Sequence, residues 1–248
     1  MWRDRPVSVI LPTYNERDSI RQTIEEFWAT GLVDEVIVVN NNAVPGTSDE
    51  VRRTRAVEVF EPRQGYGAAI RRGFQEAQGY YLAVCEPDGT FLPSDLLKLL
   101  AYTDDFEFVV GTRAMRELVW AGANMGPFLK WGNFAVAKLF EFLFNTILVT
   151  DVGCTLRVLT RPALETLRPR FRGEGSAFGL EMMLLAAIHR VPFIQIPVHY
   201  RKRVGRSSVT GDAWKAVGLG LTMIAMVLTY RLRPRRGDGA TTPEERFP

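Results

Sequence analysis

Strand-like and helical patterns alternate over the first 111 residues, and this alternation constrains the fold more than any other feature of the chain. Short apolar or β-branched runs occupy residues 7–11, 35–39, 57–60, 80–85 and 107–111. The segments between these runs carry apolar residues at helical spacing, such as Ile20, Ile24 and Phe27, or helix-capping residues. Strands separated by helices of this length are typical of βαβ units. We therefore predict an α/β fold in which helices flank a mainly parallel sheet.

Two longer apolar helices are expected in the second half of the chain. The first covers about residues 128–148, and the second, at residues 213–230, is apolar apart from Lys215. The uncharged part of the second helix would be roughly 22 Å long, shorter than the ~30 Å hydrocarbon core of a bilayer. Trp214 and a cluster of arginines flank this helix, so we expect it to lie on a membrane surface. Packing on the sheet or on a partner subunit is the alternative.

Length and composition narrow the class of protein. The 248 residues carry a formal net charge of only +3, which does not indicate a dominant nucleic-acid surface, and two cysteines argue against a disulfide framework. Because the N-terminus leads directly into a strand without a signal-peptide core, we expect a cytoplasmic protein, peripheral on the cytoplasmic face of the membrane. We divide the chain into an α/β domain (1–211), an apolar C-terminal helix that acts as a membrane-surface anchor (212–231) and a flexible basic tail (232–248).

Two carboxylates follow the fourth strand-like run at a spacing of two residues. Glu86 and Asp88 lie in a Pro-Gly loop, and Thr90 comes two residues later. Open α/β sheets bind ligands at the carboxyl ends of their strands. Oxygen ligands at that edge suit Mg²⁺ or Mn²⁺ that also holds a substrate diphosphate. A solvated acidic turn is the simpler alternative for this pattern taken alone.

Other polar motifs follow in a fixed order along the chain. The earlier ones are Pro12-Thr13-Tyr14-Asn15-Glu16, Asn40-Asn41, and a glycine-containing segment at 63–74 that includes Gly65, Gly67 and Arg71. The later ones are Gly111-Thr112-Arg113, a segment that runs from Asp151 to Arg157, Glu181 near a predicted helix start, and a segment at 197–208 that includes Arg203. Glycines allow a ligand to approach the backbone closely, and arginines bind phosphate bidentately.

Taken in this order, the motifs resemble those of the family 2 glycosyltransferases, and most closely those of polyprenyl-phosphate glycosyltransferases of the dolichol-phosphate mannosyltransferase type. The resemblance covers about residues 7–209 and implies the GT-A fold, a Rossmann-like α/β architecture. It also implies a nucleotide-sugar site made of Pro12, Tyr14, Glu16, Asn40, Asn41, Gly65, Gly67, Arg71, Glu86, Asp88 and Arg203.

The same resemblance implies three further groups of site residues. The acceptor phosphate is expected on Arg113, Lys130 and Arg157, and the metal on Glu86, Asp88 and Thr90. The residues expected to be catalytic are Asp88, Arg113, Arg157 and Arg203.

The chain departs from the family pattern at several positions. Asn40 and Asn41 replace two aspartates, and Glu86 replaces the first aspartate of the usual D-x-D. Glutamate keeps the charge, so metal binding should survive. An amide both donates and accepts hydrogen bonds, which suits uracil slightly better than guanine and weakly favours a UDP-sugar. Alternatively, the two asparagines only stabilise their own loop.

The activity implied is the inverting, metal-dependent transfer of a hexose from a UDP- or GDP-sugar to a polyprenyl or dolichyl phosphate. A phosphate nucleophile, with a second pKa near 6, needs no strong general base. One alternative is a soluble hydroxyl acceptor with Asp151 or Glu181 as the base, and another is a degenerate, non-catalytic binding module. The partners expected are a membrane surface and either a second copy of the chain or a membrane subunit, but no nucleic acid.

Overall fold

The computed structural model describes residues 1–123, 127–205 and 213–232. Its strands are β1 (Val7–Thr13), β2 (Glu35–Asn40), β3 (Val57–Phe60), β4 (Tyr81–Val84), β5 (Phe108–Thr112), β6 (Arg157–Thr160) and β7 (Phe193–Pro197). Its α-helices are α1 (Arg17–Ala29), α2 (Thr47–Arg52), α3 (Tyr66–Glu76), α4 (Leu96–Ala101), α5 (Pro127–Phe144), α6 (Arg161–Leu167), α7 (Phe178–Ile188) and α8 (Ala213–Leu232).

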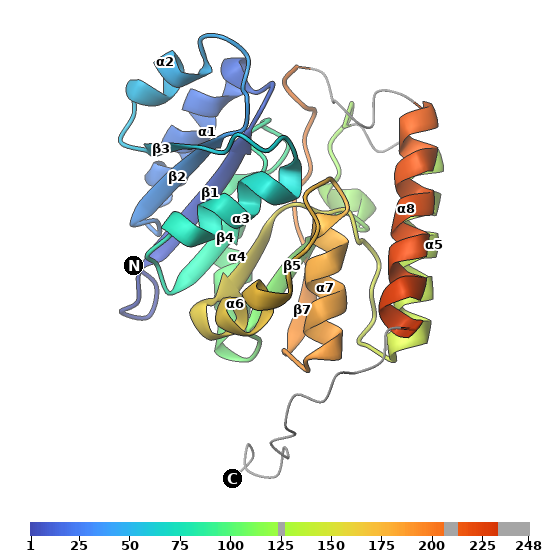
Figure 1. Cartoon of the computed structure of the whole chain (residues 1–248). Coiled ribbons are helices and arrows are strands. Elements are labelled where there is room, and N and C mark those ends of the chain that lie inside the picture. The colour runs from blue at the N-terminus through green and yellow to red at the C-terminus, as the bar shows by residue number, and fades with distance from the viewer. Residues whose placement is uncertain (124–126, 206–212, 233–248) are drawn as a thin grey trace.

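Within the described residues, seven strands form one sheet in the order β3-β2-β1-β4-β6-β5-β7 (Figure 1). Strand β6 runs antiparallel to its neighbours β4 and β5, whereas the other pairs are parallel. The predicted α/β fold with a mainly parallel, helix-flanked sheet is confirmed. Strand β6 was not predicted, because its four residues make too short a run to stand out in the sequence.

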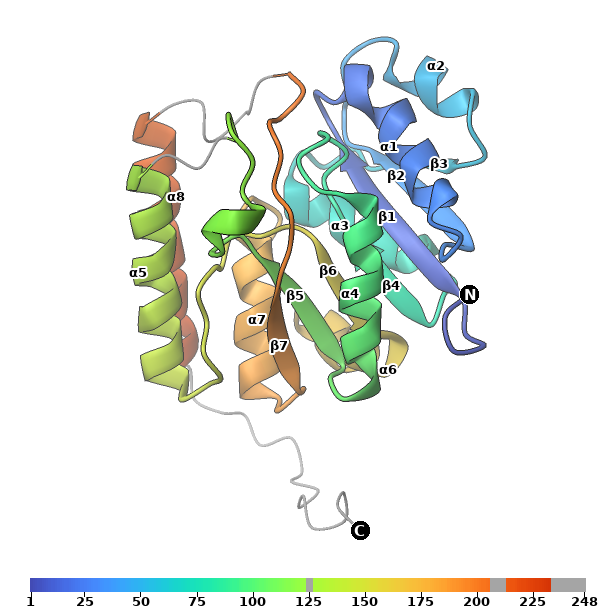
Figure 2. The same ribbon diagram turned by 180° about the vertical axis from the view of Figure 1, so that it is seen from behind.

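Successive side chains of β1 enter two different cores, because neighbouring residues of a strand point to opposite faces of the sheet. Ile10 belongs to the core that includes residues of α3, α6 and α7, whereas Val9 and Leu11 belong to the core that includes residues of α1 and α4. These two groups of helices cover opposite faces of the sheet (Figures 1 and 2). The sheet is therefore buried on both sides, and its strand ends are left to build a site.

Helices α5 and α8 lie side by side, next to α7 and beyond the β7 edge of the sheet (Figures 1 and 2). Val136 and Phe140 of α5 and Met223 and Val227 of α8 are buried in the same core as Ile10. In the described ranges, no helix has the length and apolar character needed to span a bilayer. The predicted tail lies outside the described residues apart from Leu232.

Candidate active site

The acidic loop after β4 holds its carboxylates in a tight turn. Gly89 has a φ of +75°, a left-handed conformation that glycine adopts without strain. Asp88 is 2% exposed, and its Oδ1 accepts hydrogen bonds from Thr90 N at 2.9 Å and from Thr90 Oγ1 at 2.6 Å. The Thr90 hydroxyl, predicted as a metal ligand, thus donates to Asp88 and orients that carboxylate.

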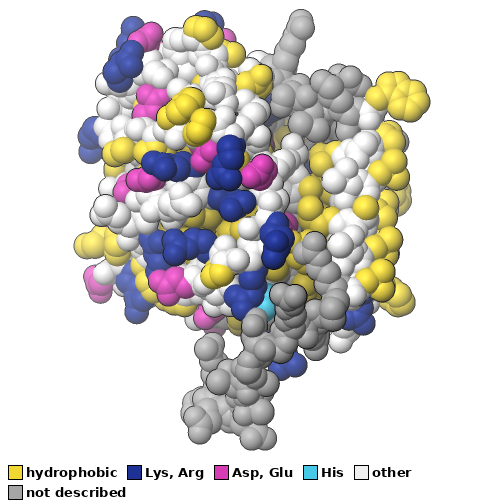
Figure 3. Space-filling model, in the orientation of Figure 1, with side chains coloured by type: hydrophobic (Ala, Val, Ile, Leu, Met, Phe, Trp, Pro, Cys, Tyr) yellow, Lys and Arg dark blue, Asp and Glu magenta, His cyan; other side chains and the backbone are white. Residues whose placement is uncertain are grey.

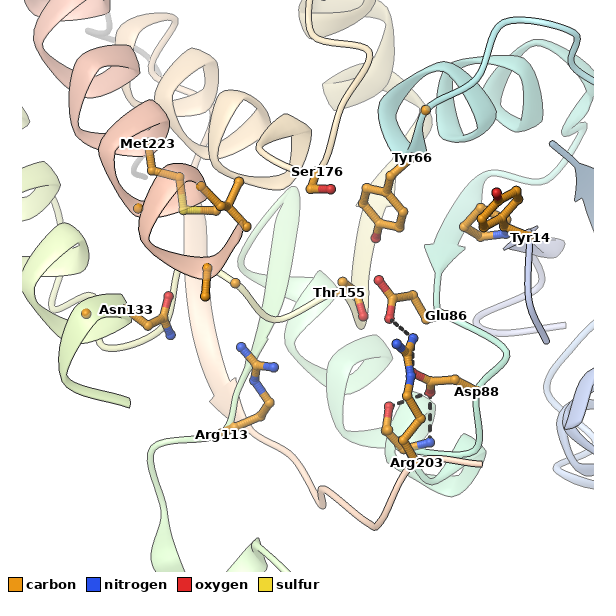
Figure 4. A pocket seen from close by; sticks show the side chains of 18 of the residues that line it. Tyr14, Tyr66, Glu86, Asp88, Arg113, Asn133, Thr155, Ser176, Arg203 and Met223 are labelled. Carbon is orange, nitrogen blue, oxygen red and sulfur yellow. Dashed lines mark hydrogen bonds and ion pairs between the residues drawn. The ribbon is translucent and has the colours of Figure 1, made fainter. Parts of the chain in front are cut away.

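Arg203 joins the acidic loop from the segment after β7. Arg201 N donates to Thr90 O at 2.7 Å and Val204 N donates to Asp88 O at 2.9 Å, so this segment runs along the loop. The Arg203 guanidinium then donates from Nε to Asp88 Oδ2 at 2.6 Å and from Nη2 to Glu86 Oε2 at 2.9 Å (Figure 4). The structure therefore brings together Glu86, Asp88 and Arg203, as the sequence predicted.

The charged groups of this cluster shift the pKa of Glu86. Burial and the neighbouring Asp88 carboxylate raise the pKa of Glu86 to about 8, while Arg203 opposes this rise. A buried carboxylate and a partly buried one side by side favour a cation between them. No group of three or more acidic, histidine or cysteine side chains suitable for a metal occurs in the described part of the chain. A divalent cation held by Glu86 and Asp88 fits this donor set if substrate oxygens and water complete its coordination, as is usual for Mg²⁺.

The loop after β1 forms the next part of the site. Pro12, Tyr14 and Glu16 line the same cavity as the acidic loop. Glu16 Oε2 accepts hydrogen bonds from Tyr14 N at 2.7 Å and from Asn15 N at 2.9 Å, which fixes the turn. Tyr14 is 42% exposed, and its ring lies on the side of the cavity opposite Met223 of α8 (Figure 4). It is available to stack on a flat ligand.

The two asparagines at the end of β2 bond to the protein itself. Asn40 Nδ2 donates to Glu58 Oε1 at 2.9 Å, and its Oδ1 accepts from Ala43 N at 2.9 Å. Asn41 Nδ2 donates to Glu61 O at 2.8 Å, and its Oδ1 accepts from Gly65 N at 2.7 Å. These contacts match the alternative in which the asparagines stabilise their loop. The amide edges that favoured uracil over guanine are therefore turned toward the protein, although Asn41 still lines the cavity.

The glycines of the 63–74 segment allow two parts of the protein to pack closely. A Cβ on Gly65, whose φ is +152°, would clash with Glu174 O, and a Cβ on Gly67 would lie 2.7 Å from Gly173 O. Of these two glycines only Gly65 lines the cavity, and Arg71 on α3 does not. The structure thus places Gly67 and Arg71 behind the predicted nucleotide site.

Arg113 follows β5 and lines another side of the cavity, where Asp151 holds its side chain. Its Nε donates to Asp151 Oδ2 at 2.8 Å and its Nη2 donates to Asp151 Oδ1 at 2.9 Å, while Asn133 of α5 also donates to Asp151. Burial alone would raise the pKa of the Asp151 carboxyl, but the Arg113 charge and hydrogen bonds lower that pKa to about 2. Asp151 is therefore an anion that orients Arg113 toward the cavity.

The other two predicted acceptor residues do not line the cavity. Arg157 is 1% exposed, and its guanidinium donates to Gly179 O at 2.8 Å and to Cys154 O. Backbone carbonyls thus bind the two terminal nitrogens of this buried guanidinium, which links β6 to α7. Lys130 lies exposed in α5. The structure therefore brings Arg113 to the site, but not Arg157 or Lys130.

The acidic loop, Arg203, Tyr14 and Arg113 border one cavity of about 670 Å³. Its polar end contains Glu86, Asp88, Arg113 and Arg203. Its other end is lined by residues of α5 and α8, namely Gly132, Asn133, Ala135, Val136, Ala216, Val217, Leu219, Gly220, Leu221, Met223 and Ile224. One cavity thus has a charged end and an apolar end.

Several cavity residues were not predicted from the sequence. They include Asn133, Tyr66, Thr155, Ser176 and the α8 residues. Asn133 carries a recognisable signal, since it is a polar residue inside an otherwise strongly apolar helix. Tyr66 and Thr155 lie inside segments that were recognised as motifs, at positions to which the sequence analysis assigned no role.

Comparison with known proteins agrees with this geometry. Residues 8–168 match Glycosyl transferase family 2, which is more than half of the chain. The chain therefore belongs to glycosyl transferase family 2, and the resemblance predicted from its motifs is confirmed.

Two curated relatives come from Haloferax volcanii. The chain is 26% identical over 221 residues to a low-salt glycan biosynthesis hexosyltransferase, a match that covers 85% of this chain and 52% of the relative. The chain thus spans about half the length of that relative. It is also 26% identical over 231 residues to a dolichyl-phosphate hexose transferase, and this match covers 92% of this chain and 96% of the relative.

A solved structure is similar over most of the chain. It is glucosyl-3-phosphoglycerate synthase from Mycobacterium tuberculosis in complex with Mn²⁺, UDP-glucose and phosphoglyceric acid. The TM-score is 0.72 at 19% identity, with 96% of this chain and 84% of that chain covered. At this identity the similarity establishes the shared α/β, GT-A-like fold.

Proposed function

We propose that this protein is an inverting, metal-dependent hexosyltransferase that moves a sugar from a nucleotide-sugar to the phosphate of a polyprenyl or dolichyl phosphate. The observation that carries this proposal is the single cavity that joins the paired carboxylates to the apolar wall of α5 and α8. A nucleotide-sugar and a lipid phosphate both need a polar site, but only the lipid phosphate needs an adjoining apolar one.

At the polar end, Glu86 and Asp88 would hold the cation, and Tyr14 would stack on the base. A bound Mg²⁺ or Mn²⁺ would neutralise charge that develops on the leaving nucleoside diphosphate. Arg203 lies within hydrogen-bonding distance of both carboxylates, so a small rotation would move its guanidinium to the diphosphate. The Mn²⁺ and UDP-glucose in the similar solved structure support this use of the site.

At the acceptor side, Arg113 is the cation placed to bind the lipid phosphate. Asp151 fixes the guanidinium from behind, which leaves other donors of the side chain for a ligand. A phosphate oxygen is largely ionised at neutral pH and attacks without a base. Attack from the face opposite the leaving group inverts the anomeric centre.

The contacts of Asp151 and Glu181 favour a phosphate acceptor over a hydroxyl acceptor. Asp151 is paired with Arg113, and Glu181 accepts hydrogen bonds from Arg172 N at 3.1 Å, from Gly173 N at 2.8 Å and from the Tyr230 hydroxyl. Both proposed bases for a hydroxyl acceptor are thus already engaged in fixed hydrogen bonds. Against the effect of burial, the pKa of Asp151 is lowered to about 2 by Arg113, so that carboxylate is a weak proton acceptor.

The outward side of the α5–α8 pair supports contact with a membrane surface. Exposed apolar side chains follow both helices (Figure 3), and the most exposed of those outside the cavity lining are Trp131, Phe142, Trp214 and Leu232, at 70% to 85%. Arg231 lies in the last turn of α8, where it suits anionic headgroups. We place the protein on the cytoplasmic face of the membrane, with the cavity opening toward its lipid acceptor.

The test is transfer of labelled sugar from UDP-glucose and, separately, from GDP-mannose to undecaprenyl and dolichyl phosphate. Each reaction is run with Mn²⁺, with Mg²⁺, with EDTA and with Asp88→Ala. We expect a chloroform-soluble product that is lost with EDTA and in the variant. If phosphoglyceric acid is glycosylated instead, the chain uses a soluble acceptor, as the name of the similar solved structure indicates for that protein. If neither nucleotide-sugar binds, the enzymatic proposal fails.

A further inference from the structure

Within the part of the chain that the structure describes, two buried hydroxyl groups in the cavity wall have no hydrogen-bond partner. They are Tyr66 Oη and Thr155 Oγ1. Among the described residues with unpaired buried side-chain nitrogen or oxygen atoms, these two alone line the cavity. Leaving a buried hydroxyl unpaired costs about 1–3 kcal/mol. Such groups need an explanation, and a ligand that pairs with both would supply one.

The positions of these hydroxyls are set by two different elements. Tyr66 is the first residue of α3, directly after Gly65, and its ring points down into the cavity (Figure 4). Thr155 lies in the loop before β6 and faces the Tyr66 hydroxyl and Glu86 in the same view. Both groups therefore lie at the junction between the metal-binding carboxylates and the apolar end.

The groups around these hydroxyls favour a neutral ligand group. Burial raises the pKa of the Tyr66 hydroxyl well above its ordinary value, Glu86 adds to this rise and the charge of Arg157 opposes it, so the phenol stays protonated and can donate. The nearby guanidiniums, Arg203 and Arg113, are both paired with carboxylates. A site made of two neutral hydroxyls and a carboxylate suits a neutral ligand rich in hydroxyl groups, because such a ligand can donate to the carboxylate and accept from the phenol.

We propose that Tyr66 and Thr155 form the subsite that recognises the hexose ring of the donor. This inference rests on the proposed function, which places the donor diphosphate on the adjacent carboxylates. The sugar is bonded to that diphosphate, so its ring lies next to Glu86. Thr155 lies in the recognised 151–157 segment, and Tyr66 lies between Gly65 and Gly67 of the 63–74 segment. These two residues thus set which hexose hydroxyls are accepted in this particular chain.

The pairing predicts selective discrimination among sugars. A site built to bond a substrate hydroxyl rejects an analogue that lacks it, because the protein groups are then left unpaired. Removing one such hydrogen bond should change affinity by about tenfold. The loss of binding affinity on removing the enzyme hydroxyl and the loss on removing the matching sugar hydroxyl should therefore be non-additive.

The experiment compares the binding of UDP and UDP-glucose by calorimetry in the presence of Mn²⁺, with GDP and GDP-mannose in parallel. The proteins are the wild type, Tyr66→Phe, Thr155→Val and Thr155→Ser. Tyr81→Phe is the matched control, since Tyr81 is a buried tyrosine of β4 that does not line the cavity. Donors that lack one hydroxyl each, the 2-, 3-, 4- and 6-deoxy analogues, complete the set.

We expect Tyr66→Phe and Thr155→Val to weaken nucleotide-sugar binding about tenfold while leaving nucleotide binding unchanged. Thr155→Ser should restore wild-type binding, and one deoxy donor should bind Tyr66→Phe as well as the full donor does. Equal losses for nucleotide and nucleotide-sugar, or no loss, would overturn the subsite and leave the donor site intact. If the wild type binds no nucleotide, the proposed function and the subsite fall together.

Discussion

The two ends of the cavity are built in different ways. At the polar end, short turns after strands hold side chains that bond to one another, as in the Arg203 contacts with Glu86 and Asp88. At the apolar end, two helices from distant parts of the sequence face the cavity with small or aliphatic residues such as Gly220 and Met223. The polar end depends on individual atoms, whereas the apolar end depends on shape and the absence of charge. Single substitutions should therefore be far more damaging at the first than at the second.

The largest effect is expected at Asp88. Asp88→Asn keeps the shape of the side chain but removes the charge that binds the cation and Arg203. Sugar transfer should fall by about 10³-fold or more. Thr90→Val is the matched control, because it removes only the hydrogen bond that orients Asp88 and should cost about tenfold. Steady-state transfer rates at saturating metal measure both, and equal effects of the two variants would contradict the assignment of Asp88 as a metal ligand.

The next effect concerns the Asp151 carboxylate behind Arg113. Asp151→Asn leaves a buried guanidinium without its counter-ion, which should lower the free energy of unfolding by about 3–5 kcal/mol at neutral pH. In the wild type, the pKa of Asp151 is lowered from 3.8 to about 2, so its stabilising contribution is complete above about pH 4. That contribution, about 2 kcal/mol, is lost as the pH falls toward 2.

Urea unfolding between pH 2 and pH 7 checks this pair. The difference between wild type and Asp151→Asn should shrink as the pH falls below 4. A difference that stays constant over this range would mean that the carboxylate charge contributes nothing.

The polar end could largely be predicted from the sequence, because strand ends and turn residues place it locally. Glu86, Asp88 and Arg203 meet as their motifs predict. Arg157 shows the limit of such predictions, because its direction depends on the pairing of β6, an antiparallel strand too short to recognise. A shift of one residue along a strand turns a side chain to the other face of the sheet. The motif alone therefore could not show that Arg157 is buried.

The apolar end could not be predicted in the same way. The composition of α5 and α8 indicated apolar helices, but a periodic pattern does not identify the neighbour of a helix. The Tyr230 hydroxyl bonds to Glu181 and holds α8 on α7, and nothing in either local sequence signals that contact. The two unpaired hydroxyls at Tyr66 and Thr155 likewise become visible only when the loops are brought together.

A smaller effect is expected from a charge at the apolar end. Ile224→Glu places a carboxylate in the cavity wall, where it would repel both the isoprenoid chain and its phosphate. The kcat/KM for a detergent-solubilised polyprenyl phosphate should fall by about tenfold to a hundredfold, with donor binding unchanged. Thr222→Glu adds the same charge on an exposed position of α8 outside the cavity lining and serves as the control. Equal losses in the two variants would show that the apolar wall does not hold the acceptor.

The smallest effect is expected on the outward face of the same helices. Phe142 is 83% exposed, so Phe142→Ser should leave stability unchanged but weaken sedimentation with anionic phospholipid vesicles by about threefold to tenfold. Leu97→Ser is the control, since Leu97 is a 48% exposed apolar residue of α4, away from the α5–α8 pair (Figure 2). If both variants lose vesicle binding equally, the α5–α8 face is not the membrane-binding surface.

The central claim is that one cavity serves both a nucleotide-sugar and a lipid phosphate. The most direct measurement is kcat/KM for geranyl, farnesyl and longer polyprenyl phosphates, with phosphoglyceric acid compared on the same preparation. The account predicts that kcat/KM rises with each isoprene unit until the apolar end is filled, and that phosphoglyceric acid is not glycosylated. A value that is independent of chain length, together with efficient glycosylation of phosphoglyceric acid, would contradict it.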